Sequence, residues 1–295
     1  MSEGPSVDGR RTAGRFVAAV LASLVGVLGA ASPRTVAAQQ SVPVPDFTID
    51  SKSAWLMVGD DFLPPPGGRP GPITFDKRYP YVDNAAARRT GTQPTYRVAD
   101  LSNPILKPWV VEEMRKANDW VLAGKIPFRA RERCYPAGVP GWVIYTLAEP
   151  ISILQTDKQV TMINHGGPEV RRIYLDVPHS ANPKPSWYGE SVGHYEGGDT
   201  LVVDTISTKT FIDNYRTPHT DQLHVIERYK LIDGGKMMEV MISVDDPGAF
   251  TTPWLAMQRF RRVQREWTED ICAENNFDFL QYEVAPLPQA AKPDF

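Results

Sequence analysis

Cysteine, excess positive charge and repeated apolar runs are all scarce in this chain of 295 residues. There are 2 cysteines, Cys134 and Cys272, and neither stands in a C-x-x-C or metal-ligand spacing. The 32 Lys and Arg residues do not outnumber the 35 Asp and Glu residues, and the net charge is −3. We therefore expect no nucleic-acid partner, because no broad cationic surface is indicated. With 27 prolines and 22 glycines, a loop-rich β protein fits better than a bundle of long helices.

The single long apolar run lies close to the N-terminus. Arg10, Arg11 and Arg15 precede it, Phe16–Ala31 carries no charge, and Val36-Ala37-Ala38 supplies small residues for cleavage. The run has about 16 residues, fewer than the roughly 20 that cross a bilayer as a helix. Residues 1–38 are therefore predicted to be a cleaved signal peptide. We expect the mature chain to be exported, to the periplasm or outside the cell, without a stable membrane span.

Export determines how the two cysteines are interpreted. An oxidising compartment favours a disulfide between Cys134 and Cys272 over two buried free thiols. Closing such a long loop would stabilise the fold by about 4–5 kcal/mol in the chain-entropy model.

Composition and periodicity divide the rest of the chain. Residues 39–103 are rich in breakers, such as the Pro/Gly-rich stretch 64–72, and are predicted to form an irregular arm around the domain. Residues 104–282 carry the periodic signal of a helix and a β-barrel, and residues 283–295 are a Pro-rich, loosely held tail. One amphipathic helix is predicted over Asn103–Gly124, with an apolar stripe at a spacing near 3.6 residues. Asn103 can cap it, but Pro108 inside the first turns makes Lys107 the alternative start.

β-branched and aromatic residues alternate with polar ones in short segments from residue 142 onward, which is typical of strands. The predicted strands are Trp142–Leu147, Ile151–Gln155, Gln159–Asn164, Val170–Asp176, Ser186–Glu196, Thr200–Ser207, Leu223–Leu231, Lys236–Val244 and Leu255–Arg265. Gly189 and Gly193 share one strand face, where we expect a sharp bend or the close approach of another backbone. About nine short strands with short connections predict a mainly β fold, a closed antiparallel barrel of the calycin type, with a two-sheet sandwich as the alternative. The short segments Ser53–Val58 and Ile73–Phe75 could add edge strands.

Several segments carry a family resemblance. They are Arg133–Pro140, Arg171–Asp176, Trp187–His194, Asp199–Thr205, Asp245–Pro247 and Cys272–Asn276, together with His219, Leu223, His224, Glu227 and Arg228. This set resembles a family of uncharacterised exported bacterial proteins with a lipocalin-like barrel, over roughly residues 104–280. The resemblance implies the barrel fold and export, and it implies no particular reaction. The chain has Asp176-Val177-Pro178-His179 where the family more often has Asp-Gly-Arg-Pro-His.

All five histidines lie between His165 and His224, and histidine is the side chain best able to exchange protons near neutral pH. We take His194, His219 and His224 as candidate catalytic residues, with Asp204 among the groups that could orient them. Candidates for contact with a small hydrophobic or aromatic ligand are Arg172, Tyr174, Trp187, Tyr188 and Trp254.

Residue alternation alone does not determine which strand faces point into the barrel. If the face of His224 points inward, His224 shares a pocket with His194 and Tyr188. If the opposite face does, Glu227 points inward and the histidines of the strands lie outside.

Three interpretations of the histidines follow. They could be structural histidines in a non-catalytic barrel that binds or carries a hydrophobic ligand. They could form a cofactor-independent acid–base site of the isomerase, hydratase or lyase type. They could also hold a metal together with His179, but no His-x-His or His-x-x-x-His spacing supports this. We favour the second hypothesis: an exported barrel enzyme with an apolar cavity and without metal or cofactor that moves protons on a small hydrophobic molecule. This hypothesis depends on imidazoles that point into the hollow interior of the barrel.

Overall fold

The computed structural model describes residues 44–48, 52–59, 61–67, 70–92, 94–128, 130, 134–144, 150–166, 169–209 and 211–264. They belong to the second of two units of the chain, residues 42–295; the first unit is residues 1–41. The predicted signal peptide, the predicted C-terminal tail and Cys272 lie outside the described residues, so the signal peptide and the pairing of Cys134 with Cys272 stay predictions. In the described part of the chain, no helix combines the length and apolar character needed to cross a membrane.

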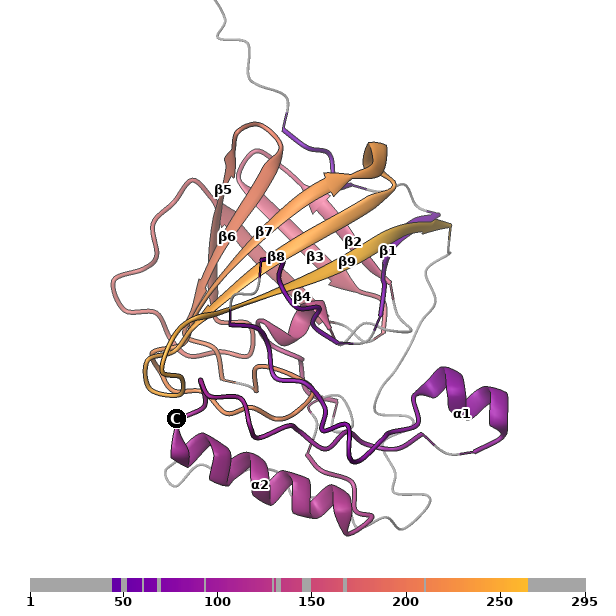
Figure 1. The fold of residues 1–295 in the computed structure, drawn as a ribbon. Coiled ribbons are helices and arrows are strands. Elements are labelled where there is room, and N and C mark those ends of the chain that lie inside the picture. The colour runs from indigo at the N-terminus through magenta and orange to yellow at the C-terminus, as the bar shows by residue number, and fades with distance from the viewer. Residues whose placement is uncertain are drawn as a thin grey trace, which may run out of the picture. The chain divides into compact units, whose positions relative to one another are not determined.

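The described strands form one closed barrel (Figure 1). They are β1 (Ser53–Met57), β2 (Ile151–Gln155), β3 (Gln159–Asn164), β4 (Glu169–Leu175), β5 (Glu190–Glu196), β6 (Thr200–Ile206), β7 (His224–Ile232), β8 (Met237–Asp245) and β9 (Trp254–Gln264). Each strand pairs with the next along the chain, and β9 pairs back with β1. The predicted mainly β barrel is thus confirmed.

The barrel is mixed, which corrects the prediction of a wholly antiparallel one. β4 and β5 run parallel, with Tyr174 opposite Val192 and Leu175 opposite Gly193. A parallel pair needs a connection that returns to the starting end of the first strand. Residues 176–189 provide this connection, and in Figure 1 they stand out beside β5 and β6.

The region before residue 104 contributes a strand of the barrel, where we expected an edge strand at most. β1 pairs with β9 from Ser53↔Gln264 to Met57↔Phe260, and it meets β2 at Trp55↔Ile151. The predicted strand Trp142–Leu147 is wrong where it is described, because Gly141–Val143 form a 3-10 helix. Its apolar residues are consecutive rather than alternating, and such a run does not distinguish a strand from another buried segment.

Two α-helices occur among the described residues, α1 (Asn84–Thr90) and α2 (Pro108–Leu122). α1 lies in the predicted irregular arm and was not expected; the carboxylate of Asp83 caps it by accepting from the backbone N–H of the third residue after it, at 2.6 Å. α2 confirms the predicted amphipathic helix but begins later. Its N-cap is Lys107, which makes no side-chain cap bond, so the alternative start is confirmed and Asn103 is not the cap.

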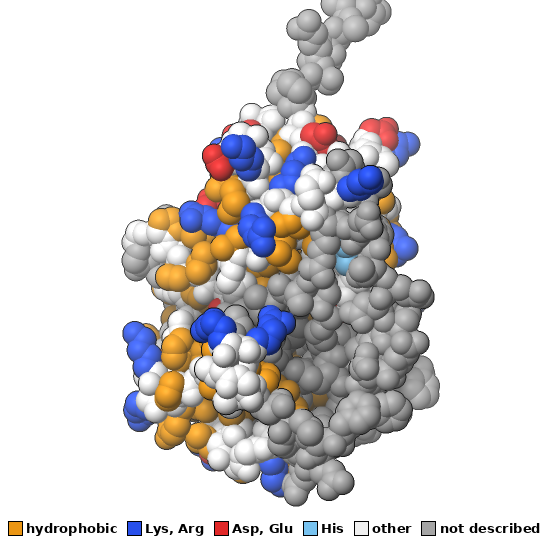
Figure 2. Space-filling view, turned by 90° about the vertical axis from the view of Figure 1, so that its right-hand side faces the viewer, with side chains coloured by type: hydrophobic (Ala, Val, Ile, Leu, Met, Phe, Trp, Pro, Cys, Tyr) orange, Lys and Arg blue, Asp and Glu red, His pale blue; other side chains and the backbone are white. Residues whose placement is uncertain are grey.

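Charged side chains are dispersed over the described part of one face of the molecule. Figure 2 shows one face, on which Lys and Arg side chains are scattered among hydrophobic and uncharged ones rather than gathered into one basic surface.

Candidate functional site

The register of β7 resolves the question of which strand face lines the barrel. Val225, Glu227 and Tyr229 are 0–1% exposed, so their face of β7 points inward. His224 and Ile226 alternate with them and point outward. The histidines of the strands therefore lie on the outer wall, and the expected pocket of inward-facing histidines is absent from the described strands.

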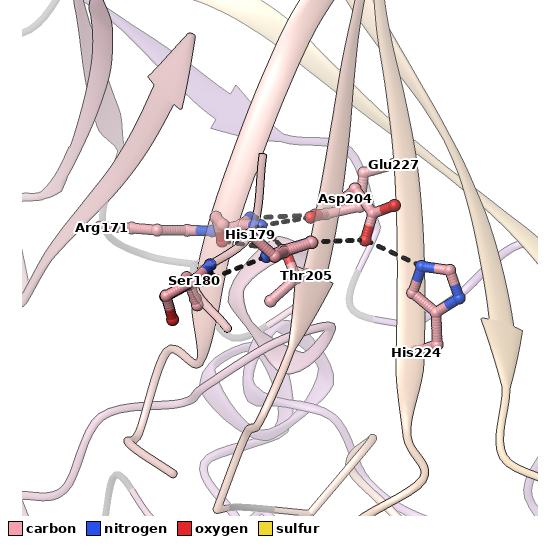
Figure 3. Close-up of polar contacts among 9 residues, drawn as sticks. Arg171, His179, Ser180, Asp204, Thr205, His224 and Glu227 are labelled. Atoms are coloured by element: carbon pink, nitrogen blue, oxygen red, sulfur yellow. Dashed lines mark hydrogen bonds and ion pairs between the residues drawn. The ribbon is translucent and has the colours of Figure 1, made fainter. Parts of the chain in front are cut away.

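Four polar side chains, His179, Glu190, Asp204 and His224, form what we call the outer-wall cluster. Asp204 lies between the two imidazoles (Figure 3): its Oδ1 accepts hydrogen bonds from His179 Nε2 at 3.1 Å and from His224 Nε2 at 2.8 Å. The barrel register explains this contact, because His224 on β7 lies opposite Ile206, two positions from Asp204 on the same face of β6.

The second nitrogen of His179 faces another carboxylate. His179 Nδ1 lies 2.9 Å from Glu190 Oε1. Glu190 also accepts from the backbone N–H and the hydroxyl of Ser180, at 2.7 and 2.6 Å. The hydrogen bonds from Ser180, and to a smaller degree His179, hold the pKa of Glu190 below its usual range. The carboxylate of Glu190 is therefore ionised at neutral pH.

His224 has the geometry of a general base. An ionised carboxylate only accepts, so its contact with Asp204 places the proton of a neutral His224 on Nε2. Nδ1 of His224 makes no hydrogen bond to a described residue, and 41% of the side chain is exposed. An imidazole oriented by a carboxylate at one nitrogen and open at the other can take a proton from a bound molecule.

The other two predicted catalytic histidines do not join the outer-wall cluster. His194 Nε2 contacts Glu196 at 3.2 Å, with half of the His194 side chain exposed. His219 Nδ1 donates to the backbone carbonyl of Thr220 at 2.8 Å. Of the three histidines chosen from the sequence, only His224 contacts Asp204, the partner that could orient a base.

The predicted ligand-binding residues are also separated. Arg172 and Tyr174 point outward from β4, and Tyr174 is 47% exposed. Trp254 is buried at the start of β9 and packs edge-on against Phe250. These side chains line no common pocket.

The remaining two aromatic candidates pack against other rings. Trp187 stacks on Tyr135, with ring centroids 4.9 Å apart and an interplanar angle of 16°. Tyr188 packs edge-on against Trp142, and its hydroxyl donates to Glu169 at 3.2 Å. Both residues are engaged in packing between segments.

The interior of the barrel contains a buried ion pair. Arg171 Nη1 donates to Glu227 Oε1 at 3.0 Å, and Nη2 contacts the other oxygen of Glu227. Tyr229 donates to Glu227 at 2.8 Å, and Arg171 donates to Thr205 at 3.1 Å and Ser191 at 3.3 Å. Burial opposes the charge of Arg171, but Glu227 and Tyr229 together more than offset this and raise the Arg171 pKa. At this level the lumen is filled by polar side chains.

Sequence reasoning missed this network, although a signal was present. Arg171 lies two and four positions before Ile173 and Leu175, so all three side chains share one face of β4. If the apolar residues of this face point into the barrel, Arg171 points inward as well. The buried pair fixes side chains in the core, and its burial leaves it no access to a substrate.

A further group able to exchange protons near neutral pH is Asp61. Burial raises the pKa of Asp61 to about 6, although Arg97 and a hydrogen bond from Tyr215 act in the opposite direction. Arg97 Nη1 lies 4.0 Å from the carboxylate. Among the described residues the carboxylate of Asp61 contacts Arg97 and the hydroxyl of Tyr215, and burial raises the pKa of Tyr215 further above its usual range. Neither partner is a base at neutral pH, so the outer-wall cluster is the better candidate for chemistry.

Metal binding has no geometric support in the described ranges. No group of three or more His, Cys, Asp or Glu side chains there is arranged to hold a metal ion. The outer-wall cluster is instead a network of hydrogen bonds between imidazoles and carboxylates.

The sequence matches no protein-family model and no curated protein. Function is therefore inferred from the geometry of the site.

Proposed function

We propose that this protein is an exported enzyme that transfers protons on a small hydrophobic molecule at the outer-wall cluster. The observation that carries the proposal is the pair of Asp204 and His224, in which one imidazole nitrogen is held by the carboxylate and the other is open. His224 is the base and Asp204 orients it. No metal or cofactor takes part in this proposal.

The reaction divides into steps that the pair can perform. Nδ1 of neutral His224 takes a proton from a carbon of the bound molecule, and the resulting imidazolium is stabilised by Asp204 at 2.8 Å. The electron pair left on the substrate expels a leaving group or moves to a neighbouring atom. His224 then returns its proton to the product or to water, as in an elimination or an isomerisation.

Apolar side chains around the pair support a hydrophobic substrate. Asp204 lies opposite Val192 on β5 and Ile226 on β7, and His224 lies opposite Ile206. All three apolar residues are partly exposed on the outer face. A small aromatic or aliphatic group could rest on this surface beside Nδ1 of His224, and its burial would contribute about 25 cal/mol per Å².

We also propose that the barrel is of the calycin type and that the protein is exported, as the family resemblance implies. The closed barrel with successive antiparallel neighbours from β5 to β9 supports the first point. The parallel pairing of β4 with β5 is a departure from that type.

The proposal can be tested with nitrobenzisoxazole, a small aromatic compound. When a base removes its ring C–H proton, the ring N–O bond breaks and a coloured cyanophenolate forms, so absorbance reports the proton transfer directly. We expect the purified protein to accelerate this reaction. His224→Ala should lower the rate by about 10²-fold, and Asp204→Asn should lower it as well because the orienting carboxylate is lost.

His194→Ala is the matched control, because His194 is exposed on the same wall and does not contact Asp204. Its rate should equal that of the unaltered protein. Equal rates for His224→Ala and His194→Ala would refute the catalytic role. Saturable binding of the compound without acceleration would favour the non-catalytic carrier instead.

A further inference from the structure

The crossover between β4 and β5, residues 176–189, is attached to the barrel mainly at its ends; we call it the strap. The backbone N–H of Asp176 donates to Gly193 at 2.8 Å, and that of Ser186 donates to Ser207 at 3.0 Å. Between these two points the side chains are exposed, except for His179 and Pro183. The middle of the strap therefore lacks a buried apolar anchor, and its position depends on polar contacts.

In the middle of the strap, the described polar contacts with the barrel are made to two carboxylates, those of Glu190 and Asp204. His179 contacts Glu190 on β5 and Asp204 on β6, and Ser180 donates twice to Glu190. Asp204 is shared with His224 on β7. The charged groups that face His179 are thus Glu190 and Asp204, with His224 beyond the latter.

Both contacts of His179 are hydrogen bonds to ionised carboxylates only when the imidazole is charged. Both ring nitrogens of His179 lie within hydrogen-bond distance of a carboxylate oxygen, at 2.9 and 3.1 Å. Ionised carboxylates accept and cannot donate, whereas a neutral imidazole has a single N–H. Only the imidazolium makes both hydrogen bonds, and a neutral His179 leaves a nitrogen lone pair facing a negative oxygen.

We propose that His179 is a protonation-dependent latch that holds the strap against β5 and β6 when it is charged and releases its middle when it is neutral. Imidazoles as a class change charge between about pH 5 and pH 8, and this is the range over which the latch is tested. The low pKa of Glu190 keeps one receiving carboxylate ionised through that range.

Release has a consequence for the outer wall. Asp204 would keep His224 as its partner and lose His179, and the strap would no longer lie over the carboxylate. The latch itself does not depend on the proposed chemistry, whereas any effect on turnover rests on the proposed function.

Hydrogen–deuterium exchange of the peptide that spans the middle of the strap tests the latch without any substrate. The amide of Ser180, which donates to Glu190 at 2.7 Å, is the reporter. After correction for intrinsic exchange, we expect its protection to fall about tenfold or more from about pH 5 to about pH 8. In His179→Gln the protection should be low and independent of pH.

His194→Gln is the control, because it removes an exposed histidine from the same wall and leaves the strap contacts in place. Its strap should follow the pH dependence of the unaltered protein. Exchange of β7 and β8 peptides in the same samples shows that each variant is folded. Protection that does not change with pH in the unaltered protein, or a pH dependence that survives in His179→Gln, would overturn the latch. Neither outcome bears on the elimination assay, so the two proposals fail separately.

Discussion

At Asp61, the surroundings of one carboxyl group determine how the stability of the folded chain changes with pH. Burial raises its pKa from 3.8 to about 6. Between these two values the folded state holds a proton that the unfolded state has released. The contribution of Asp61 to the free energy of unfolding is therefore fully present below the unfolded pKa, and it is lost as the pH rises through about 6.

Asp61→Asn should remove this dependence, because an amide keeps an acceptor for Tyr215 and does not ionise. We expect the unfolding free energy of the variant, relative to the unaltered protein, to increase between about pH 4 and pH 7 by up to about 3 kcal/mol. Urea unfolding followed by tryptophan fluorescence at several pH values measures the difference. Asp213, whose pKa burial also raises, leaves a residual dependence of the same sign in both proteins. A difference that is constant with pH would contradict the prediction.

The residues of the candidate site were only partly predictable from the sequence. His224 was selected because of its chemistry, and Asp204 was among the groups considered to orient it. His179 was considered only as a metal ligand. Its contacts with Glu190 and Asp204 were not predictable, because they depend on a strap that folds back over two strands. Alternation places Glu227 and His224 on opposite faces of β7, but it does not say which face is inside. The burial of the opposing side chains decides that, and it is a property of the closed barrel.

Among the elements, strands with clear alternation were predicted well, and those that depend on distant partners were not. β2 to β4 and β6 to β9 coincide with predicted segments to within a few residues. β1 was underestimated because its partner β9 lies near the other end of the described chain. The parallel direction of β5 was missed because a loop of this length allows either direction. Local sequence therefore predicted the strands, while the closure and the one parallel pair arise from long-range packing.

Gly193 allows the parallel and antiparallel neighbours of β5 to approach closely. A Cβ added there would lie 2.9 Å from the backbone oxygen of Val202 and 2.9 Å from Ile173 Cγ2. Because a carbonyl of the adjacent strand cannot move without disturbing the ladder, we expect Gly193→Ala to destabilise the fold by about 1–3 kcal/mol in urea unfolding. Gly71→Ala is the control, since its Cβ would meet Pro65 at 3.5 Å, an ordinary contact. Equal unfolding midpoints for the two variants would show that β5 can shift to make room.

At the scale of the whole molecule, closure of the barrel couples the two ends of the described chain. β1 fills the position between β9 and β2, and it buries Trp55 completely. The indole N–H of Trp55 donates to the carbonyl of Phe47 at 2.9 Å, which ties the preceding segment to the same place. A barrel without β1 would have two open edges and an exposed apolar interior.

A chain that begins at Phe62 should therefore fail to form the barrel. Each large side chain that leaves the core, such as Trp55 and Met57, removes about 1.5–3 kcal/mol, while a domain is stable by only about 5–15 kcal/mol in total. We expect this shortened chain to form soluble aggregates in size-exclusion chromatography and to lose its cooperative thermal transition.

The reference is the chain from Gln39, the start expected after signal cleavage. A synthetic peptide of residues 44–59, added in trans, should restore part of the transition because it can occupy the gap between β9 and β2. A shortened chain that stays monomeric with an unchanged transition would mean that β9 pairs with β2 without β1, and that the barrel closes with one strand fewer.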